Sequence, residues 1–276
     1  MKSLWSLHCF LLLSGVLSFS LTSFAFTLAS RASAETIKAE HPTAANPSFV
    51  LFEPPNGDTV NNSRGGASRP AEVKCAEDDA YGFPLTALIP QSGLGLTTRA
   101  HPTLMVYVPP TTARQVHFTL RDSNRQGLYQ TQIPIAPTGG ILNITLPADS
   151  PELLVGSRYQ WSLGLLCQSP QTDMPIARGQ IQRVDVPEDV AWVNQPLLAQ
   201  ATAYGQAGIW HDMLASLVVL QQRQADHSEL SDGQLSDGQL SDGQLSHYWV
   251  QLLEAEQLGA IARSPLLNQT GVPSPK

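Results

Sequence analysis

Two cysteines bracket a run of alternating strands, and this arrangement constrains the fold of the chain more than any other feature. Cys75 precedes the first strongly alternating segment, and Cys167 ends the longest one. The remaining cysteine, Cys9, lies in an apolar leader that we expect to be removed. Two cysteines in an oxidising compartment usually pair, whereas two cysteines without a nearby histidine do not make a zinc site. The sequence therefore predicts a Cys75–Cys167 disulfide that closes a β domain.

The amino terminus has the pattern of an export signal. Lys2 supplies the positive charge, an apolar stretch covers about residues 10–21, and the small residues Ala32-Ser33-Ala34 suit signal peptidase. We expect cleavage after Ala34. The alternative is an uncleaved anchor, because residues 9–29 are long enough to span a bilayer. No later segment is long and apolar enough to do so, and the mature chain is expected in the periplasm or outside the cell.

The charge of the chain argues against two classes of partner. Removing residues 1–34 takes away Lys2 and Arg31 and no acidic residue, so the net charge changes from −7 to about −9. The remaining basic residues form no cluster. An acidic chain of this kind is a poor ligand for nucleic acid or for an anionic membrane surface.

Residues 35–74 have the composition of a disordered linker. Prolines and polar residues are frequent, and aliphatic residues lack a regular period. Such a segment buries too little apolar surface to offset its chain entropy. A short apolar stretch, Phe49–Pro55, could form a strand or dock on a partner, although a sticky patch within a linker is the simpler interpretation.

Residues 75–187 predict an antiparallel β-sandwich that is immunoglobulin-like only in a loose sense. Apolar and polar residues alternate, and turn-forming residues separate the segments. Several short strands at this spacing are typical of a sandwich. The predicted strands are 103–108, 115–121, 128–133, 141–146, 158–167 and 176–185. In the fifth strand, Trp161 and Cys167 share one parity, so Cys167 should point inward.

Residues 188–262 change to a helical period and predict a small helical cap. Helices are expected at 195–207 and 209–224, with a break at Gly208, and at about 247–258. The first two resemble one tetratricopeptide-type hairpin. One such unit is not a solenoid, so we expect it to pack on the sandwich or on itself. Residues 263–276 are predicted to be a disordered tail.

A repeat of the five residues Leu-Ser-Asp-Gly-Gln begins at Leu230 and occurs three times, ending at Gln244. Asp-Gly at this spacing could suggest calcium. However, one carboxylate per unit lacks the alternating ligands of known calcium loops. We predict a flexible loop over residues 228–246.

No motif in the sequence carries a reaction. The chain has no nucleophile elbow, no zinc-protease motif, and no phosphate or dinucleotide loop, so no catalytic residue, metal site or cofactor is predicted. The acidic run Glu77, Asp78 and Asp79 could hold a cation, but a solvated loop is the simpler interpretation. Together with Trp210 and His211, these acids form a possible interaction surface.

Several spaced motifs resemble a cyanobacterial family called domain of unknown function 928. The resemblance covers about residues 65–262. It is carried by Gly65-Gly66-x-x-Arg69, Cys75, Leu85–Pro90, Pro102-Thr103, Tyr107–Pro109, Arg158-Tyr159-x-Trp161, Cys167 and Gly208-Ile209-Trp210-x-Asp212. The resemblance implies an exported cyanobacterial envelope protein and supplies no activity or catalytic residue.

Two functional classes follow from these observations. We expect a non-catalytic cell-envelope module that binds a protein or a glycan, because export, a closed β domain and a tether occur without a reaction motif. The alternative is an envelope hydrolase that acts on glycan or peptide with acids such as Glu77, Asp78 and Asp79 or with a histidine that the fold brings beside them. A weaker alternative is an accessory of an envelope secretion or sensory system.

Overall fold

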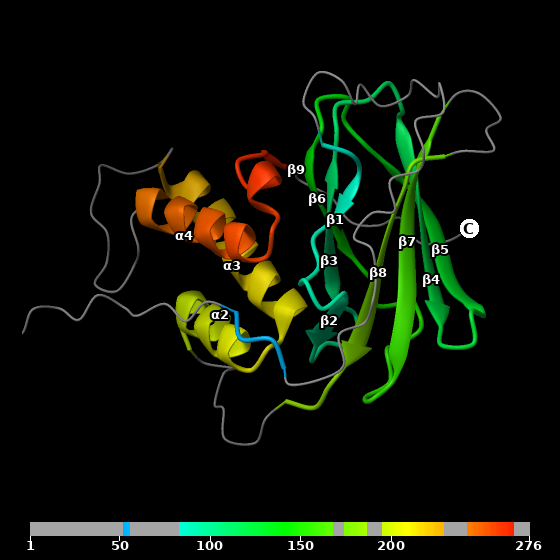
Figure 1. Ribbon diagram of the computed structural model, residues 1–276, viewed down its shortest axis with the longest axis horizontal. Helices are drawn as coiled ribbons and strands as arrows, with labels where there is room; N and C mark the ends of the chain where they lie inside the picture. Colours follow the sequence, from blue (N-terminus) through cyan, green and yellow to red (C-terminus); the bar gives the residue numbers. More distant parts are fainter. Residues whose placement is uncertain (1–51, 56–82, 168–173, 187–194, 229–241, 268–276) are drawn as a thin grey trace, which may run out of the picture. The chain divides into compact units, whose positions relative to one another are not determined.

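The computed structural model describes residues 52–55, 83–167, 174–186, 195–228 and 242–267. All of them belong to one compact unit, Pro47–Lys276. Within it, two β-sheets are followed by three helices, which confirms the predicted sandwich with a helical carboxyl-terminal region (Figure 1).

The first sheet has four strands in the order β1-β3-β6-β9, and the second has five in the order β2-β8-β7-β4-β5. Most neighbouring strands are antiparallel, whereas β2–β8 and β6–β9 are parallel. The strands are β1 (Thr86–Ala87), β2 (Leu94–Thr97), β3 (Thr103–Val108), β4 (Gln115–Asp122), β5 (Gly127–Pro134), β6 (Gly140–Thr145), β7 (Arg158–Leu166), β8 (Ile176–Arg183) and β9 (Leu266–Leu267).

The six predicted strands correspond to β3 to β8 within two residues at each end. Strands β1, β2 and β9 were not predicted. Two of them have only two residues, and β2 contains Gly95, so none carries a recognisable alternation. Strand β9 also shows that the predicted tail begins too early, because Leu266 and Leu267 pair with β6.

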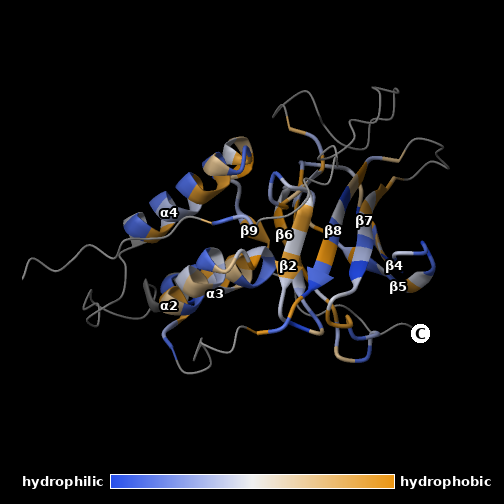
Figure 2. Ribbon diagram, turned by 60° about the horizontal axis from the view of Figure 1, so that its bottom comes forward, coloured by the Kyte–Doolittle hydropathy of each residue, from blue (hydrophilic) through white to orange (hydrophobic). Residues whose placement is uncertain are grey.

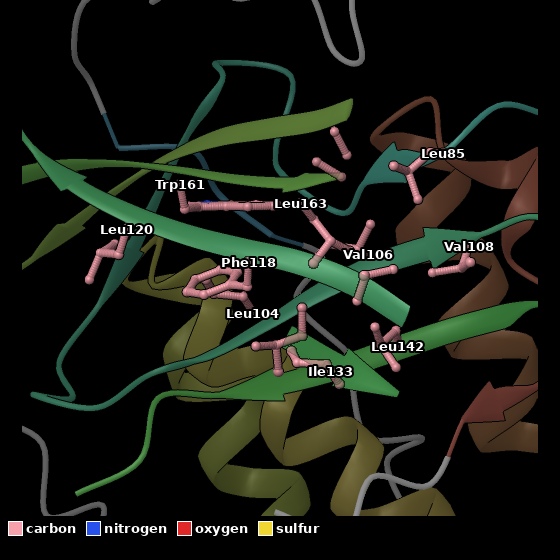
Figure 3. Close-up of a cluster of buried hydrophobic side chains, with 14 of the residues drawn as sticks. Leu85, Leu104, Val106, Val108, Phe118, Leu120, Ile133, Leu142, Trp161 and Leu163 are labelled. Atoms are coloured by element: carbon pink, nitrogen blue, oxygen red, sulfur yellow. The ribbon is translucent and has the colours of Figure 1, made fainter. Parts of the chain in front are cut away.

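The main hydrophobic core lies between the two sheets. Side chains from β3 and β6 meet side chains from β4, β5 and β7 (Figure 3). Trp161 is fully buried there, opposite Gly179 of β8. A Cβ atom on Gly179 would lie 2.6 Å from the indole ring, so the tryptophan requires glycine at this position. Cys167 packs against the same core, in agreement with its predicted inward orientation.

A second core lies on the other face of the four-stranded sheet. Met105 and Tyr107 of β3 and Ile141 of β6 pack there with apolar residues of the helices. The helices are α2 (Leu197–Gln206), α3 (Trp210–Ser228), α4 (Asp242–Ala255) and the 3₁₀ helix η1 (Gly259–Ile261). Helices α3 and α4 carry both apolar and polar residues (Figure 2). The cap therefore packs on the sandwich, and β3 is buried on both faces.

One boundary of the helical region differs clearly from the prediction, and one agrees with it. Helix α4 begins at Asp242, inside the predicted flexible loop 228–246, because Leu245 directly after the last repeat unit turns its side chain into the helical core. The rest of the repeat, residues 229–241, lies outside the described residues. Gly208 separates α2 from α3 as predicted, and its positive φ of 69° explains why glycine stands there.

Candidate functional site

The start of helix α3 carries three consecutive buried side chains that contain polar atoms. Trp210, His211 and Asp212 are each at most 1% exposed. Trp210 and His211 were predicted to lie on a possible interaction surface, and the structure corrects this placement, because both side chains are inside the fold. Glu77, Asp78 and Asp79 lie outside the described residues.

Asp212 accepts hydrogen bonds from the end of β2 and the residue that follows it. Thr97 Oγ1 donates to Oδ1 at 2.6 Å, and the backbone N–H and the hydroxyl of Thr98 donate to Oδ2 at 2.8 and 2.5 Å. The carboxylate also lies in the first turn of α3, where the helix dipole favours a negative charge. Asp212 therefore joins the helix to β2.

His211 packs against the same strand. A Cβ atom on Gly95 of β2 would overlap the His211 Nε2 atom, so the ring occupies the space that a side chain would fill. Nε2 is buried and has no hydrogen-bond partner among the described residues. Burial lowers the pKa of His211 to about 3. The imidazole is therefore neutral at physiological pH and has no access to a substrate.

Trp210 connects the helix to the four-stranded sheet and to the amino-terminal segment. Its indole N–H donates to the Leu88 carbonyl at 2.9 Å, just after β1. Its ring meets Phe52 edge to face, with centroids 4.9 Å apart. The Glu53 N–H donates to the Gly205 carbonyl at 3.0 Å. The apolar stretch that was assigned to a linker thus docks, at Phe52 and Glu53, on the helical hairpin of the same chain.

A second carboxylate fixes the other end of the helical region. Glu256, just after α4, accepts the backbone N–H of Gln91 at 2.7 Å. The Gln91 side chain donates to the Ala255 carbonyl at 2.8 Å. Asp212 and Glu256 therefore hold the two ends of the segment that contains β2. Both buried acids stabilise the junction between helices and sandwich.

The described residues also contain an exposed apolar pair. Leu154 and Val155, in the loop between β6 and β7, are 65% and 46% exposed. Leu153 beside them is fully buried and anchors the loop in the sandwich core. Its backbone N–H donates to the Ala100 carbonyl at 3.0 Å. The apolar pair thus stands next to a fixed residue.

Further hydrogen bonds hold the same loop. The Leu154 N–H donates to the Tyr159 hydroxyl at 2.8 Å. Arg183 donates from Nη1 to the Leu153 carbonyl at 2.7 Å, and its own carbonyl accepts from the Gly156 N–H at 2.7 Å. These bonds leave the loop with a defined backbone and two aliphatic side chains in solvent. The sequence pattern had indicated only a turn here.

Two kinds of feature are absent from the part of the chain that the structure describes. It contains no group of three or more side chains that could together hold a metal ion. None of its helices combines the length and apolarity needed to cross a membrane.

Comparisons with known proteins give one informative match. The family model described as Domain of Unknown Function (DUF928) matches residues 64–266. No curated protein matches the chain. Among solved structures, the fn3 domain of the human collagen alpha-1(XX) chain is 16% identical, with a TM-score of 0.24, over 39% of this chain and 84% of that domain. A Parabacteroides merdae beta-glucuronidase is 12% identical, with a TM-score of 0.19, over 63% of this chain and 22% of the enzyme.

Proposed function

This chain belongs to the family described as Domain of Unknown Function (DUF928), and on that premise we propose that it is an exported, non-catalytic protein of the cell envelope that binds a protein partner. The finer parts of this proposal are a cyanobacterial origin, cleavage after Ala34 and a Cys75–Cys167 disulfide in the periplasm or outside the cell. They rest on the sequence patterns given above.

The exposed pair Leu154 and Val155 carries the proposal. Apolar side chains in solvent gain free energy when a partner covers them. Because the loop is already held by backbone hydrogen bonds, little conformational entropy is lost on binding. Branched aliphatic side chains offer no hydrogen bonds to sugar hydroxyls, which favours a protein over a glycan as the partner.

The hydrolase alternative receives no support from the described residues. His211 is buried and neutral, and Asp212 is engaged by Thr97 and Thr98. A general base must reach a proton of the substrate, and these two groups face the interior of the protein.

The experiment that tests the proposal is site-specific photo-crosslinking in the native envelope. A photoreactive amino acid at position 154 should give a heterologous adduct, and the same amino acid at the exposed position Gln160 of β7 should not. The double substitution Leu154→Asp and Val155→Asp, in a chain labelled elsewhere on the loop, should remove the adduct. Equal adducts at positions 154 and 160, or turnover of a glycosidase, esterase or peptidase substrate by the purified chain, would overturn the proposal.

A further inference from the structure

We propose that β5 is a self-association edge, through which two copies of this chain pair antiparallel and join their five-stranded sheets. Strand β5 spans eight residues and lies at the end of its sheet, bonded only to β4 among the described strands (Figure 1). The other sheet ends are different. Strands β1 and β9 have two residues each, and β2 is covered by His211 and bonded to Asp212.

The register of β5 with β4 shows which backbone groups of β5 point away from its one partner among the described strands. The Ile135 N–H donates to the Arg114 carbonyl at 3.0 Å. Backbone groups alternate in direction along a strand, so the N–H and C=O groups of Ile133 and Thr131 also point toward β4. Gln130 and Gln132 therefore direct their N–H and C=O groups away from the sheet. Pro134 fits this parity, because its missing N–H would also point outward.

Strand β5 lacks protection at its centre. Natural edge strands are usually blunted by charged residues, by proline or by bulges. The sequence of β5, Gly-Leu-Tyr-Gln-Thr-Gln-Ile-Pro, has no charged residue. Its register shift lies at the amino-terminal end, opposite Leu120 and Arg121, and Pro134 is its last residue. Both devices lie outside Gln130 to Gln132, and no described strand pairs with the outer edge of this segment.

A second copy fits this edge because the pairing is self-complementary. A twofold axis at Thr131 places Gln130 of one copy opposite Gln132 of the other. The outward N–H groups of both glutamines then meet the outward carbonyls of their counterparts, and no donor of the central segment is left over. Neutral glutamines opposite each other cause no repulsion. The Thr131 residues of the two copies face each other across the axis, in a non-hydrogen-bonded pair.

The mature chain, residues 35–276, provides the test by light scattering and analytical ultracentrifugation. We expect the wild-type chain to show a concentration-dependent dimer. Gln130→Lys with Gln132→Lys places like charges opposite each other, and should weaken the dimer at least about tenfold in dissociation constant. The matched control is Gln115→Lys with Gln160→Lys, which adds the same charge at exposed positions of β4 and β7. Circular dichroism establishes that every variant is folded.

A cross-link tests the register independently of any loss of stability. Thr131→Cys should give a covalent dimer under mild oxidation, whereas Gln115→Cys should not. The proposal would be overturned by any of three results: a wild-type chain that stays monomeric, a dimer that persists with both edge lysines, or a Thr131→Cys variant that forms no cross-link. These results also cover the case in which β5 accepts a strand from another protein instead of from a second copy. Loss of the position-154 adduct would leave this result unaffected, so the two proposals fail separately.

Discussion

The sandwich core and the junction at the start of α3 hold the molecule together by different physics. The core between the sheets consists of apolar side chains whose contribution depends on shape and burial. At the junction, Trp210 and Asp212 bond to Leu88, Thr97 and Thr98. A core of this kind is insensitive to pH, whereas the junction contains a buried carboxylate and a buried neutral imidazole. The motif Gly-Ile-Trp-His-Asp therefore has a structural role.

The largest effect is expected in the sandwich core. Phe118 is fully buried in β4, and Phe118→Ala should lower the free energy of unfolding by about 3–5 kcal/mol, because it removes apolar contacts and leaves a cavity. Urea denaturation measures the change. Phe83→Ala is the control at a 39% exposed phenylalanine, with an expected change within about 0.5 kcal/mol. Equal losses for both variants would contradict the assignment of the core.

Much of this core could be predicted from the sequence, because alternation is a local signal. The alternation places Leu104, Val106 and Val108 on one face, and all three are buried between the sheets. The same pattern could not predict that Met105 and Tyr107 are also buried. Their burial depends on helices that lie far along the chain and cover the outer face of β3.

The contacts of the junction at the start of α3 could not be predicted for the same reason. Its sequence motif was visible, but the partners of Asp212 precede it by 114 and 115 residues. A carboxylate beside a histidine in sequence can equally belong to an exposed catalytic pair. Gly95 makes room for the His211 ring, but it lies in a strand of four residues whose partner β8 is distant in sequence, so no local pattern indicated this contact. The local sequence pattern therefore identified these residues but could not predict that they are buried.

Asp212→Ala should give the second largest effect and would test the polar character of the junction. The hydroxyls of Thr97 and Thr98 and one backbone N–H would lose their acceptor, and unsatisfied buried donors are costly. We expect a loss of about 2–4 kcal/mol in the free energy of unfolding, measured by urea denaturation.

Asp212→Asn retains an acceptor oxygen and should lose less than the alanine variant. Hydrogen exchange should accelerate at the Thr98 amide in both variants. Asp185→Ala removes an exposed aspartate and serves as the control, with little change. A loss at Asp212 no larger than at Asp185 would mean that apolar packing alone holds the junction.

The pH dependence of stability separates the two regions more sharply. The folded-state pKa of His211 is about 3 and the unfolded value is about 6.5. The unfolded chain therefore binds the proton first, so the stabilising effect of neutral His211 is complete above pH 6.5 and declines as the pH falls toward 3. Between pH 7 and pH 4.5 we expect the protonation of His211 in the unfolded chain to lower the free energy of unfolding by about 1–3 kcal/mol.

Denaturation curves at several pH values, compared between wild type and His211→Asn, measure this contribution. The variant should show a shallower decline in acid. His247→Asn, at an exposed histidine of α4, should keep the wild-type slope. If His211→Asn retains the full acid dependence, the titrating group lies elsewhere and the buried neutral imidazole is not the source.

The smallest effect is expected at the rim of the junction, and it defines where the junction ends. Arg99 Nε lies 4.0 Å from Asp212 Oδ1, with 55% of its side chain exposed to solvent. Solvent screens such a pair, so Arg99→Ala should change the free energy of unfolding by at most about 1 kcal/mol, and added salt should reduce the difference. A loss comparable to that of Asp212→Ala would show that the charge pair, rather than the hydrogen bonds from Thr97 and Thr98, holds the carboxylate in place.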